Sequence, residues 1–244
     1  MTNPTLVRWH VGRVIGRRYE ADSAVRLELD VPTWPGNDAG SHLDLRLTAP
    51  DGYQASRSYS LASSGESTRV VLVVHEVPDG EVSPFLVHQL AEGDEVEIQG
   101  PLGRYFIWNP ADPDRSPVQL IAGGSGVVPL FSMASAREGV EESADFRLLY
   151  SVRTPRDVLF ADELGALSRT TVDIVHTRES PPRSVRPPGR LTRDGVAAVS
   201  FSASASPRTY ICGPTAFVET IVEWLLELGH DPARIRTERF GGSN

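Results

Sequence analysis

The period of the hydrophobic residues changes part-way along this chain of 244 residues, and that change constrains the fold more than any other feature. In the first hundred residues apolar and polar side chains alternate, as in Leu43-Asp44-Leu45-Arg46-Leu47. Strict alternation is typical of a half-buried strand. About six such strands, with turn signals between them, predict a closed antiparallel β-barrel over residues 1–107. We expect the strands over residues 7–19, 25–29, 43–47, 57–61, 70–77 and 95–98, and one short helix over 84–90.

A polar, proline-rich segment, residues 108–117, follows this region, and we interpret it as a linker. Beyond it, short apolar strands alternate with helices, which predicts a parallel sheet in an α/β domain over residues 118–244. The helix expected over residues 215–228 has one apolar stripe, formed by Phe217, Ile221, Leu225 and Leu228. We expect the strands over residues 118–122, 146–150, 172–175, 209–211 and 234–240.

The composition argues against several classes of protein. A net charge of −8 makes nucleic acid an unexpected partner, because a protein that binds the phosphate backbone needs a basic excess. No run of about 18 apolar residues exists, so we expect no membrane span. The single cysteine allows no internal disulfide and no four-thiolate iron–sulfur cluster, and residues 1–6 lack the apolar core of a signal peptide. These features predict a cytoplasmic protein, and the absence of lysine among its 24 basic residues is typical of a high-GC bacterial genome.

The first motif that indicates chemistry is Arg57-Ser58-Tyr59-Ser60, on an expected strand. Arg57 and Tyr59 should point to one face and the two serines to the other. An arginine can pair with a phosphate, a tyrosine ring can lie against a flat heterocycle, and a serine hydroxyl can bond to a ring nitrogen. The alternative is an ordinary surface strand of alternating polarity.

The second motif is the glycine-rich turn from Gly123 to Pro129, between an expected strand and an expected helix. Its glycines allow backbone N–H groups to approach a pyrophosphate, and the helix N-terminus attracts negative charge. The spacing is G-x-G-x-x-P rather than the G-x-G-x-x-G of a Rossmann fold. The alternative is a tight turn with no ligand.

The third motif is Cys212-Gly213-Pro214, at the end of an expected strand and just before a helix. Ligands of open parallel sheets bind at this edge. A lone cysteine can equally be an inert core residue. The order of the three motifs, the first in a β domain and the other two at strand ends of an α/β domain, favours a joint function.

In this order the motifs resemble the ferredoxin–NADP reductase superfamily, most of all the bacterial reductase components of oxygenase systems, over nearly the whole chain. The resemblance implies a flavin-binding β-barrel followed by a nicotinamide-binding α/β domain. It implies that Arg57 contacts the flavin pyrophosphate, that Tyr59 packs on the flavin and that Ser60 faces its N5. The residues that it assigns to the flavin are Arg57, Ser58, Tyr59, Ser60, Val74, His75, Gly80, Val82, Ser83 and Phe240.

By the same resemblance the second and third motifs bind the nicotinamide dinucleotide, and Cys212 sets the nicotinamide C4 against the flavin N5. Ser60 and Cys212 are therefore the expected catalytic residues, and no metal site is expected. The residues assigned to the dinucleotide are Gly124, Ser125, Gly126, Val127, Pro129, Arg153, Thr177, Arg178, Cys212, Gly213 and Pro214.

The ends of the second and third strands of this domain favour NADPH over NADH. Arg153 stands where NAD-dependent dehydrogenases often have an acid, and Thr177-Arg178 resembles a site for the 2′-phosphate. Arginines that only cap strand ends are the alternative. The segment from Arg178 to Arg193 is rich in arginine, and it could bind the 2′-phosphate, dock an acidic partner or be a solvated loop.

The resemblance implies a flavoprotein that passes hydride from NADPH to bound FAD and then single electrons to a separate iron–sulfur or haem protein, such as a ferredoxin or an oxygenase. FMN is the less favoured flavin, and a monomer is expected. Two alternatives stay open. One is an NAD(P)H:flavin reductase that releases reduced flavin, and the other is a flavin-binding electron-transfer subunit of a larger complex.

Overall fold

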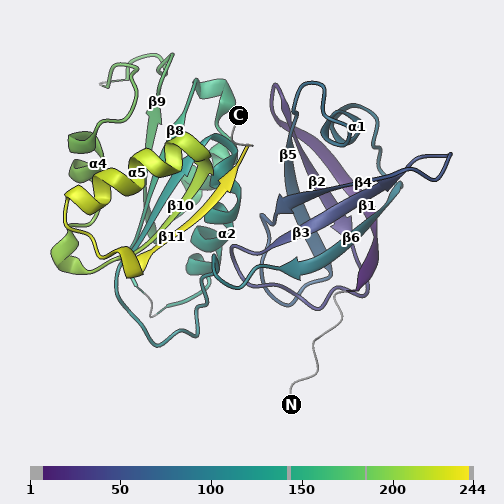
Figure 1. The fold of residues 1–244 in the computed structure, drawn as a ribbon, viewed down its shortest axis with the longest axis horizontal. Coiled ribbons are helices and arrows are strands. Elements are labelled where there is room, and N and C mark those ends of the chain that lie inside the picture. The colour runs from purple at the N-terminus through teal and green to yellow at the C-terminus, as the bar shows by residue number, and fades with distance from the viewer. Residues whose placement is uncertain (1–7, 142–143, 185, 242–244) are drawn as a thin grey trace. The chain divides into compact units, whose positions relative to one another are not determined.

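The computed structural model describes residues 8–141, 144–184 and 186–241. The chain divides into two compact units, Met1–Arg104 and Tyr105–Asn244. Figure 1 shows that strands dominate the first unit and that helices flank a sheet in the second. No helix within the described residues is both long and apolar enough to cross a membrane.

The first unit is an antiparallel sheet of six strands in the order β4-β3-β6-β1-β2-β5, as the alternation predicts. An isolated bridge between Leu61 and Leu72 joins the segment after β4 to β5, so the two outer strands of the sheet approach each other. One helix accompanies the sheet. The elements are β1 (Trp9–Ala21), β2 (Ala24–Asp30), β3 (His42–Thr48), β4 (Gln54–Ser60), β5 (Arg69–His75), α1 (Ser83–His88) and β6 (Glu95–Leu102).

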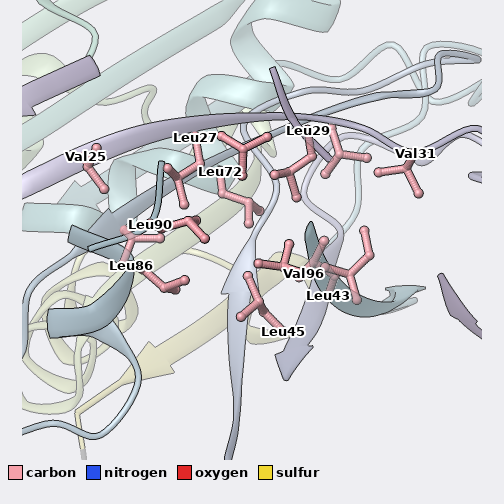
Figure 2. Packing of buried hydrophobic residues seen from close by; sticks show 14 of the residues in the cluster. Val25, Leu27, Leu29, Val31, Leu43, Leu45, Leu72, Leu86, Leu90 and Val96 are labelled. Atoms are coloured by element: carbon pink, nitrogen blue, oxygen red, sulfur yellow. The ribbon is translucent and has the colours of Figure 1, made fainter. Parts of the chain in front are cut away.

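The core of this unit forms where the alternating strands turn their apolar faces inward. In Figure 2 Leu27 and Leu29 of β2 lie beside Leu72 of β5, together with Leu86 of α1. All four are fully buried. Burial of such a side chain stabilises the fold by roughly 1.5–3 kcal/mol. Helix α1 begins at Ser83 with a proline in its first turn, a position where the missing N–H costs no hydrogen bond.

The second unit is a sheet of five strands in the order β11-β10-β7-β8-β9. Every adjacent pair is parallel, so all the strands end at the same edge. The strands are β7 (Val118–Gly123), β8 (Phe146–Val152), β9 (Thr170–His176), β10 (Arg208–Pro214) and β11 (Ile235–Phe240). The α-helices are α2 (Val127–Glu138), α3 (Ala161–Ala166), α4 (Arg193–Val199) and α5 (Thr215–Glu227).

Helix α5 packs on this sheet through a stripe that differs in part from the predicted one. Ile221 and Leu225 are buried against the sheet as predicted, and Val218 is buried beside them. Leu228 lies at the C-cap and is half-buried, and Phe217 is only partly buried. Phe217 packs against the edge of the core, and its ring lies beside Gly123 and Gly213, near the candidate site.

The segment 105–117 is bound to the second unit by side chains. The Tyr210 hydroxyl donates to the carbonyl of Ile107 at 3.0 Å, and Arg208 pairs with Asp112 at 2.8 Å. Arg234 pairs with Asp114 at 3.0 Å, and two hydrogen bonds with Ser116 together with the nearby arginines hold the pKa of Asp114 well below its usual range. The polar residues that suggested a linker therefore form ion pairs with the sheet.

Candidate functional site

Strand β4 presents the first motif on two faces, as the alternation predicts. Arg57 and Tyr59 are paired with Leu45 and Leu43 of β3, so they share the face that carries the core. Ser58 lies on the opposite face, where its hydroxyl donates to Asp44 at 2.5 Å. Arg57 is exposed on β4, which is an edge strand of the sheet, so a ligand can reach it.

The last two residues of β4, Tyr59 and Ser60, are less exposed than Arg57 and Ser58 before them. Tyr59 packs partly buried against the core, and burial raises the pKa of its hydroxyl to about 12, so the ring stays neutral. Ser60 is half-buried and pairs with His42 across the sheet. Burial lowers the pKa of His42 despite the nearby Asp44. The lowered pKa favours the neutral form of the histidine paired with Ser60, the residue that the resemblance assigns to flavin N5.

Arg57 meets the turn before α1 through an ion pair. Its Nη2 lies 2.8 Å from the Oε2 of Glu81. The Tyr53 hydroxyl donates to the other carboxylate oxygen of Glu81 at 3.0 Å. The structure therefore brings together the arginine and the turn 80–83 that the resemblance assigns to the flavin pyrophosphate.

Position 80 of this turn has little room for a side chain. A Cβ on Gly80 would lie 2.9 Å from the carbonyl oxygen of Val77 and 3.2 Å from the hydroxyl of Ser83. Ser83 is buried, and its hydroxyl accepts the N–H of Val77 at 3.0 Å. The backbone of this turn, the proton of the Ser83 hydroxyl and the exposed side chain of Glu81 are the groups that can contact a ligand.

Two of the residues assigned to the flavin have side chains in the core. Val74 and Val82 are buried in the hydrophobic core of the first unit, so only their backbone groups can face a ligand. His75 is exposed and bonds to the hydroxyl of Ser23 at 3.1 Å. The flavin roles of these three residues stay predictions.

In the second unit the glycine-rich turn stands at the carboxyl edge of the sheet. Strand β7 ends at Gly123, a 3-10 turn spans Gly124–Gly126, and α2 begins at Val127. Gly124 has a φ of 56°, in the left-handed region that favours glycine. The first N–H groups of a helix have no partner within it, and they attract anions. Val127 and Pro129 are buried, so they anchor α2 while the half-buried Ser125 stays accessible.

The glycine-rich turn and the Cys-Gly-Pro turn lie in direct contact. A Cβ on Gly126 would lie 2.2 Å from the carbonyl oxygen of Cys212, closer than any side chain tolerates. The ring of Phe217 fills the space beside the other two glycines, 2.7 Å from a Cβ on Gly123 and 2.8 Å from one on Gly213. The absence of side chains at these positions therefore joins the second and third motifs into one site.

Cys212 is a buried thiol rather than a reactive one. Burial, followed by the charge of Glu238, raises its pKa well above the ordinary value, although the N–H of Gly213 opposes the shift. A thiol that stays protonated suits a role in positioning. Pro214 is exposed beside it and pairs with Phe240 of β11, which is 37% exposed. The role of Phe240 toward a flavin stays a prediction.

Glu238 is a site residue that the sequence analysis missed. It is the β11 partner of Cys212 in the parallel register. Burial raises the pKa of its carboxyl group from 4.5 to about 7. In the sequence, Glu238 stands two residues before Phe240, which the resemblance assigns to the flavin. Only the register of β10 and β11 shows that Glu238 lies beside Cys212.

The three residues expected to bind the 2′-phosphate follow β8 and β9, and only one of them lines a cavity. Thr177 lines a cavity of about 460 Å³, together with Arg190 and Trp224. Arg153 and Arg178 are exposed and do not line it, and the N–H of Arg178 donates to the carbonyl of Arg153 at 2.9 Å. Arg190, from the arginine-rich segment, is thus the arginine that the structure places in the cavity with Thr177.

Two family models match the chain. Residues 21–107 match the oxidoreductase FAD-binding domain, and residues 120–223 match the oxidoreductase NAD-binding domain. The first range includes the Arg57 motif and the turn 80–83, and the second includes the glycine-rich turn and Cys212. The residues present fit each group. In the first unit Arg57 lies against the tight turn at Gly80, and in the second the Gly126–Cys212 contact leaves no room for a side chain at the glycine-rich turn.

Several characterised proteins are similar to this chain. The flavohemoprotein of Rhodopirellula baltica is 30% identical over 216 residues, 83% of this chain and 52% of that protein. The reductase component of propane 2-monooxygenase from Mycolicibacterium smegmatis is 30% identical over 195 residues, 76% and 54% of the two chains. The chain thus spans about half the length of these relatives. The crystal structure of the Amycolatopsis cytochrome P450 reductase superposes with a TM-score of 0.83 at 28% identity, over 96% of this chain and 70% of that one.

Replacement of Gly126 by alanine should destabilise the second unit. The new Cβ would overlap the carbonyl of Cys212, and we expect a loss of at least about 2 kcal/mol. Urea unfolding followed by circular dichroism measures this loss. Gly165→Ala, on a helix where a Cβ meets nothing within 4 Å, is the matched control and should not destabilise the protein. Equal stability of the two variants would contradict the close contact.

Replacement of Glu238 by glutamine should change how stability depends on pH. A pKa raised from 4.5 to about 7 means that the carboxyl group's contribution is complete below about pH 4.5 and is lost as the pH rises through about 7. Glu238→Gln should match the parent at about pH 4 and exceed its stability by about 1–3 kcal/mol at about pH 8.5.

Urea unfolding at both pH values tests this expectation for Glu238. Glu219→Gln, which removes an exposed carboxylate from α5, is the control and should show no such divergence. A constant difference between Glu238→Gln and the parent across the pH range would contradict the raised pKa.

Proposed function

Because the chain belongs to the ferredoxin–NADP reductase family, with an FAD-binding and an NAD-binding oxidoreductase domain, we propose that it is the reductase of an electron-transfer system. In this proposal it oxidises NADPH, uses FAD as its redox group and delivers single electrons to a separate iron–sulfur or haem protein. The similarity to the reductase component of propane 2-monooxygenase supports an oxygenase as the acceptor. Bound FAD supplies the chemistry that converts a two-electron hydride donor into a one-electron donor.

The observation that supports this proposal most is the contact of Gly126 with Cys212. It joins the N-terminus of α2, which attracts a pyrophosphate, to a buried neutral thiol at the same edge of the sheet. A dinucleotide bound along this edge would place its phosphates on the turn and its nicotinamide toward Cys212. Because the thiol stays protonated, its part is to orient the ring without reacting with it.

On the flavin side the residues of the first unit have separate tasks. Arg57 and the backbone of the turn 80–83 would bind the pyrophosphate. Tyr59, held neutral and half-buried, would support the ring. Ser60 would donate a hydrogen bond to N5, the atom that receives the hydride. We infer FAD rather than FMN from the match of residues 21–107 to an FAD-binding domain.

The first test is to release the flavin of the purified protein, identify it and compare NADPH with NADH turnover using ferricyanide as acceptor. A firmly bound FAD and rapid NADPH oxidation are expected. A flavin that is absent after purification, with turnover only when free flavin is added, would favour a flavin reductase. Bound flavin without NAD(P)H oxidation would favour a non-catalytic subunit.

Ser60→Ala should slow reduction of the flavin while leaving it bound. The variant loses the hydrogen bond to N5, and we expect a decrease of about 10-fold to 100-fold in the reduction rate. Anaerobic stopped-flow absorbance measures this rate. Ser56→Ala, an exposed serine at the other end of β4, is the control and should keep the parent rate. An unchanged rate in Ser60→Ala would remove the assigned role.

Arg190→Ala should reduce the preference for NADPH. Loss of one charge-assisted contact to the 2′-phosphate should raise the KM for NADPH at least about tenfold and change the KM for NADH little. Steady-state kinetics with both nucleotides measures the change. Arg186→Ala, an exposed arginine of the same segment outside the cavity, is the control. An equal rise in both KM values would assign Arg190 to a contact common to NADH and NADPH.

A further inference from the structure

Glu81 forms an ion pair with Arg57, the arginine assigned to the flavin pyrophosphate. We propose that Glu81 sets the affinity for flavin, because its carboxylate holds Arg57 and must release it before a phosphate can pair there. This inference rests on the proposed function, in which Arg57 binds the flavin pyrophosphate. It predicts a flavin that binds more weakly than the rest of the site would allow.

The contact joins two elements that are distant in the sequence. Arg57 comes from β4, and Glu81 comes from the turn before α1, with 2.8 Å between Nη2 and Oε2. The Nη1 of the same guanidinium donates to the carbonyl of Ser56 at 2.7 Å. A carboxylate and a phosphate oxygen accept the same charge-assisted bonds from arginine, so Glu81 stands where a phosphate would bind.

A second residue fixes the carboxylate in this position. The Tyr53 hydroxyl donates to the Oε1 of Glu81 at 3.0 Å, so both carboxylate oxygens are engaged. The hydrogen bond with Glu81 also raises the pKa of Tyr53 above its ordinary value, which keeps the hydroxyl protonated as a donor. Tyr53, Glu81 and Arg57 therefore form a cluster of three connected side chains.

The cluster lies at the surface, where a ligand can displace it. The side chains of Arg57 and Glu81 are each 52% exposed. Exposed ion pairs contribute little to stability because water and salt screen them, so the pair can open at small cost. Tyr53 and Glu81 also line a cavity of about 660 Å³, with Leu47 and Phe85 among its other walls. This cavity gives the displaced carboxylate room to move.

Even when a phosphate displaces Glu81 from Arg57, the nearby carboxylate still weakens its binding. A phosphate bound at Arg57 would lie close to the Glu81 carboxylate, and like charges repel most strongly at short range. If Glu81 stays on Arg57, the phosphate loses its charge-assisted partner. Either arrangement weakens binding, and a neutral side chain of the same shape at position 81 removes both effects.

The test measures the Kd of the flavin-free protein for FAD by quenching of flavin fluorescence. Glu81→Gln should bind FAD about tenfold more tightly than the parent, the effect of regaining one charge-assisted contact. Tyr53→Phe keeps the charge but loosens the carboxylate, and it should also tighten binding, by a smaller factor. Glu28→Gln breaks another exposed arginine–glutamate pair of the same unit, with Arg69, and should leave the Kd unchanged.

Three results would overturn the inference: unchanged or weaker FAD binding by Glu81→Gln, no gain in Tyr53→Phe, or an equal gain in Glu28→Gln. Circular dichroism and thermal unfolding of each flavin-free variant check that it is folded. The proposed function fails separately, because it requires that the parent itself binds FAD. If the parent and all variants bind FAD with the same affinity, the proposed function stands and the role of Glu81 is wrong.

Discussion

The close approach of the Gly126 backbone to the carbonyl of Cys212 is the constraint on which the rest of the second unit depends. It requires glycine at the start of α2, and it fixes the end of β10 against the end of β7. The ring of Phe217, which packs against the edge of the core, then covers the neighbouring Gly123 and Gly213. A helix N-terminus and a protonated thiol meet at one place because no side chain separates them.

Both units of this acidic protein contain a local site suited to anions. In the first, Arg57 stands beside a tight turn and pairs with its exposed Glu81 carboxylate. In the second, the N-terminus of α2 and Arg190 lie at the carboxyl edge of the parallel sheet. Phosphates are the feature that FAD and the pyridine nucleotides share. A protein of net charge −8 can attract them only through such local groups.

The local pattern of apolar residues and glycines in the sequence was enough to predict the architecture of the two sheets. Alternation over Leu43–Leu47 predicts a strand of one sheet, and the glycine-rich turn after an apolar strand predicts a βα unit of the other, as the structure confirms. The family resemblance is confirmed as well, by the FAD-binding and NAD-binding domains that match the chain. These features depend on residues near one another in the chain, which is why a single sequence could reveal them.

The parts of the site that sequence reasoning missed depend on contacts between distant segments. Glu238 lies beside Cys212 because β10 and β11 pair in parallel register, and burial there raises the pKa of its carboxyl group. Arg190 enters the cavity of Thr177 through the path of a long loop, while the more obvious Arg153 and Arg178 stay outside it. The ion pair of Arg57 with Glu81 spans two elements. No spacing rule predicts such pairs, because chain topology and not local period brings them together.

In the proposed function, this chain transfers a hydride from a pyridine nucleotide to a flavin that it binds itself. The most direct measurement is an anaerobic titration of the purified, flavin-loaded protein with NADPH, followed by the flavin absorbance band. We expect that one equivalent of NADPH per bound flavin bleaches the band, with no flavin released into the filtrate. A band that persists with excess NADPH and with excess NADH would contradict it.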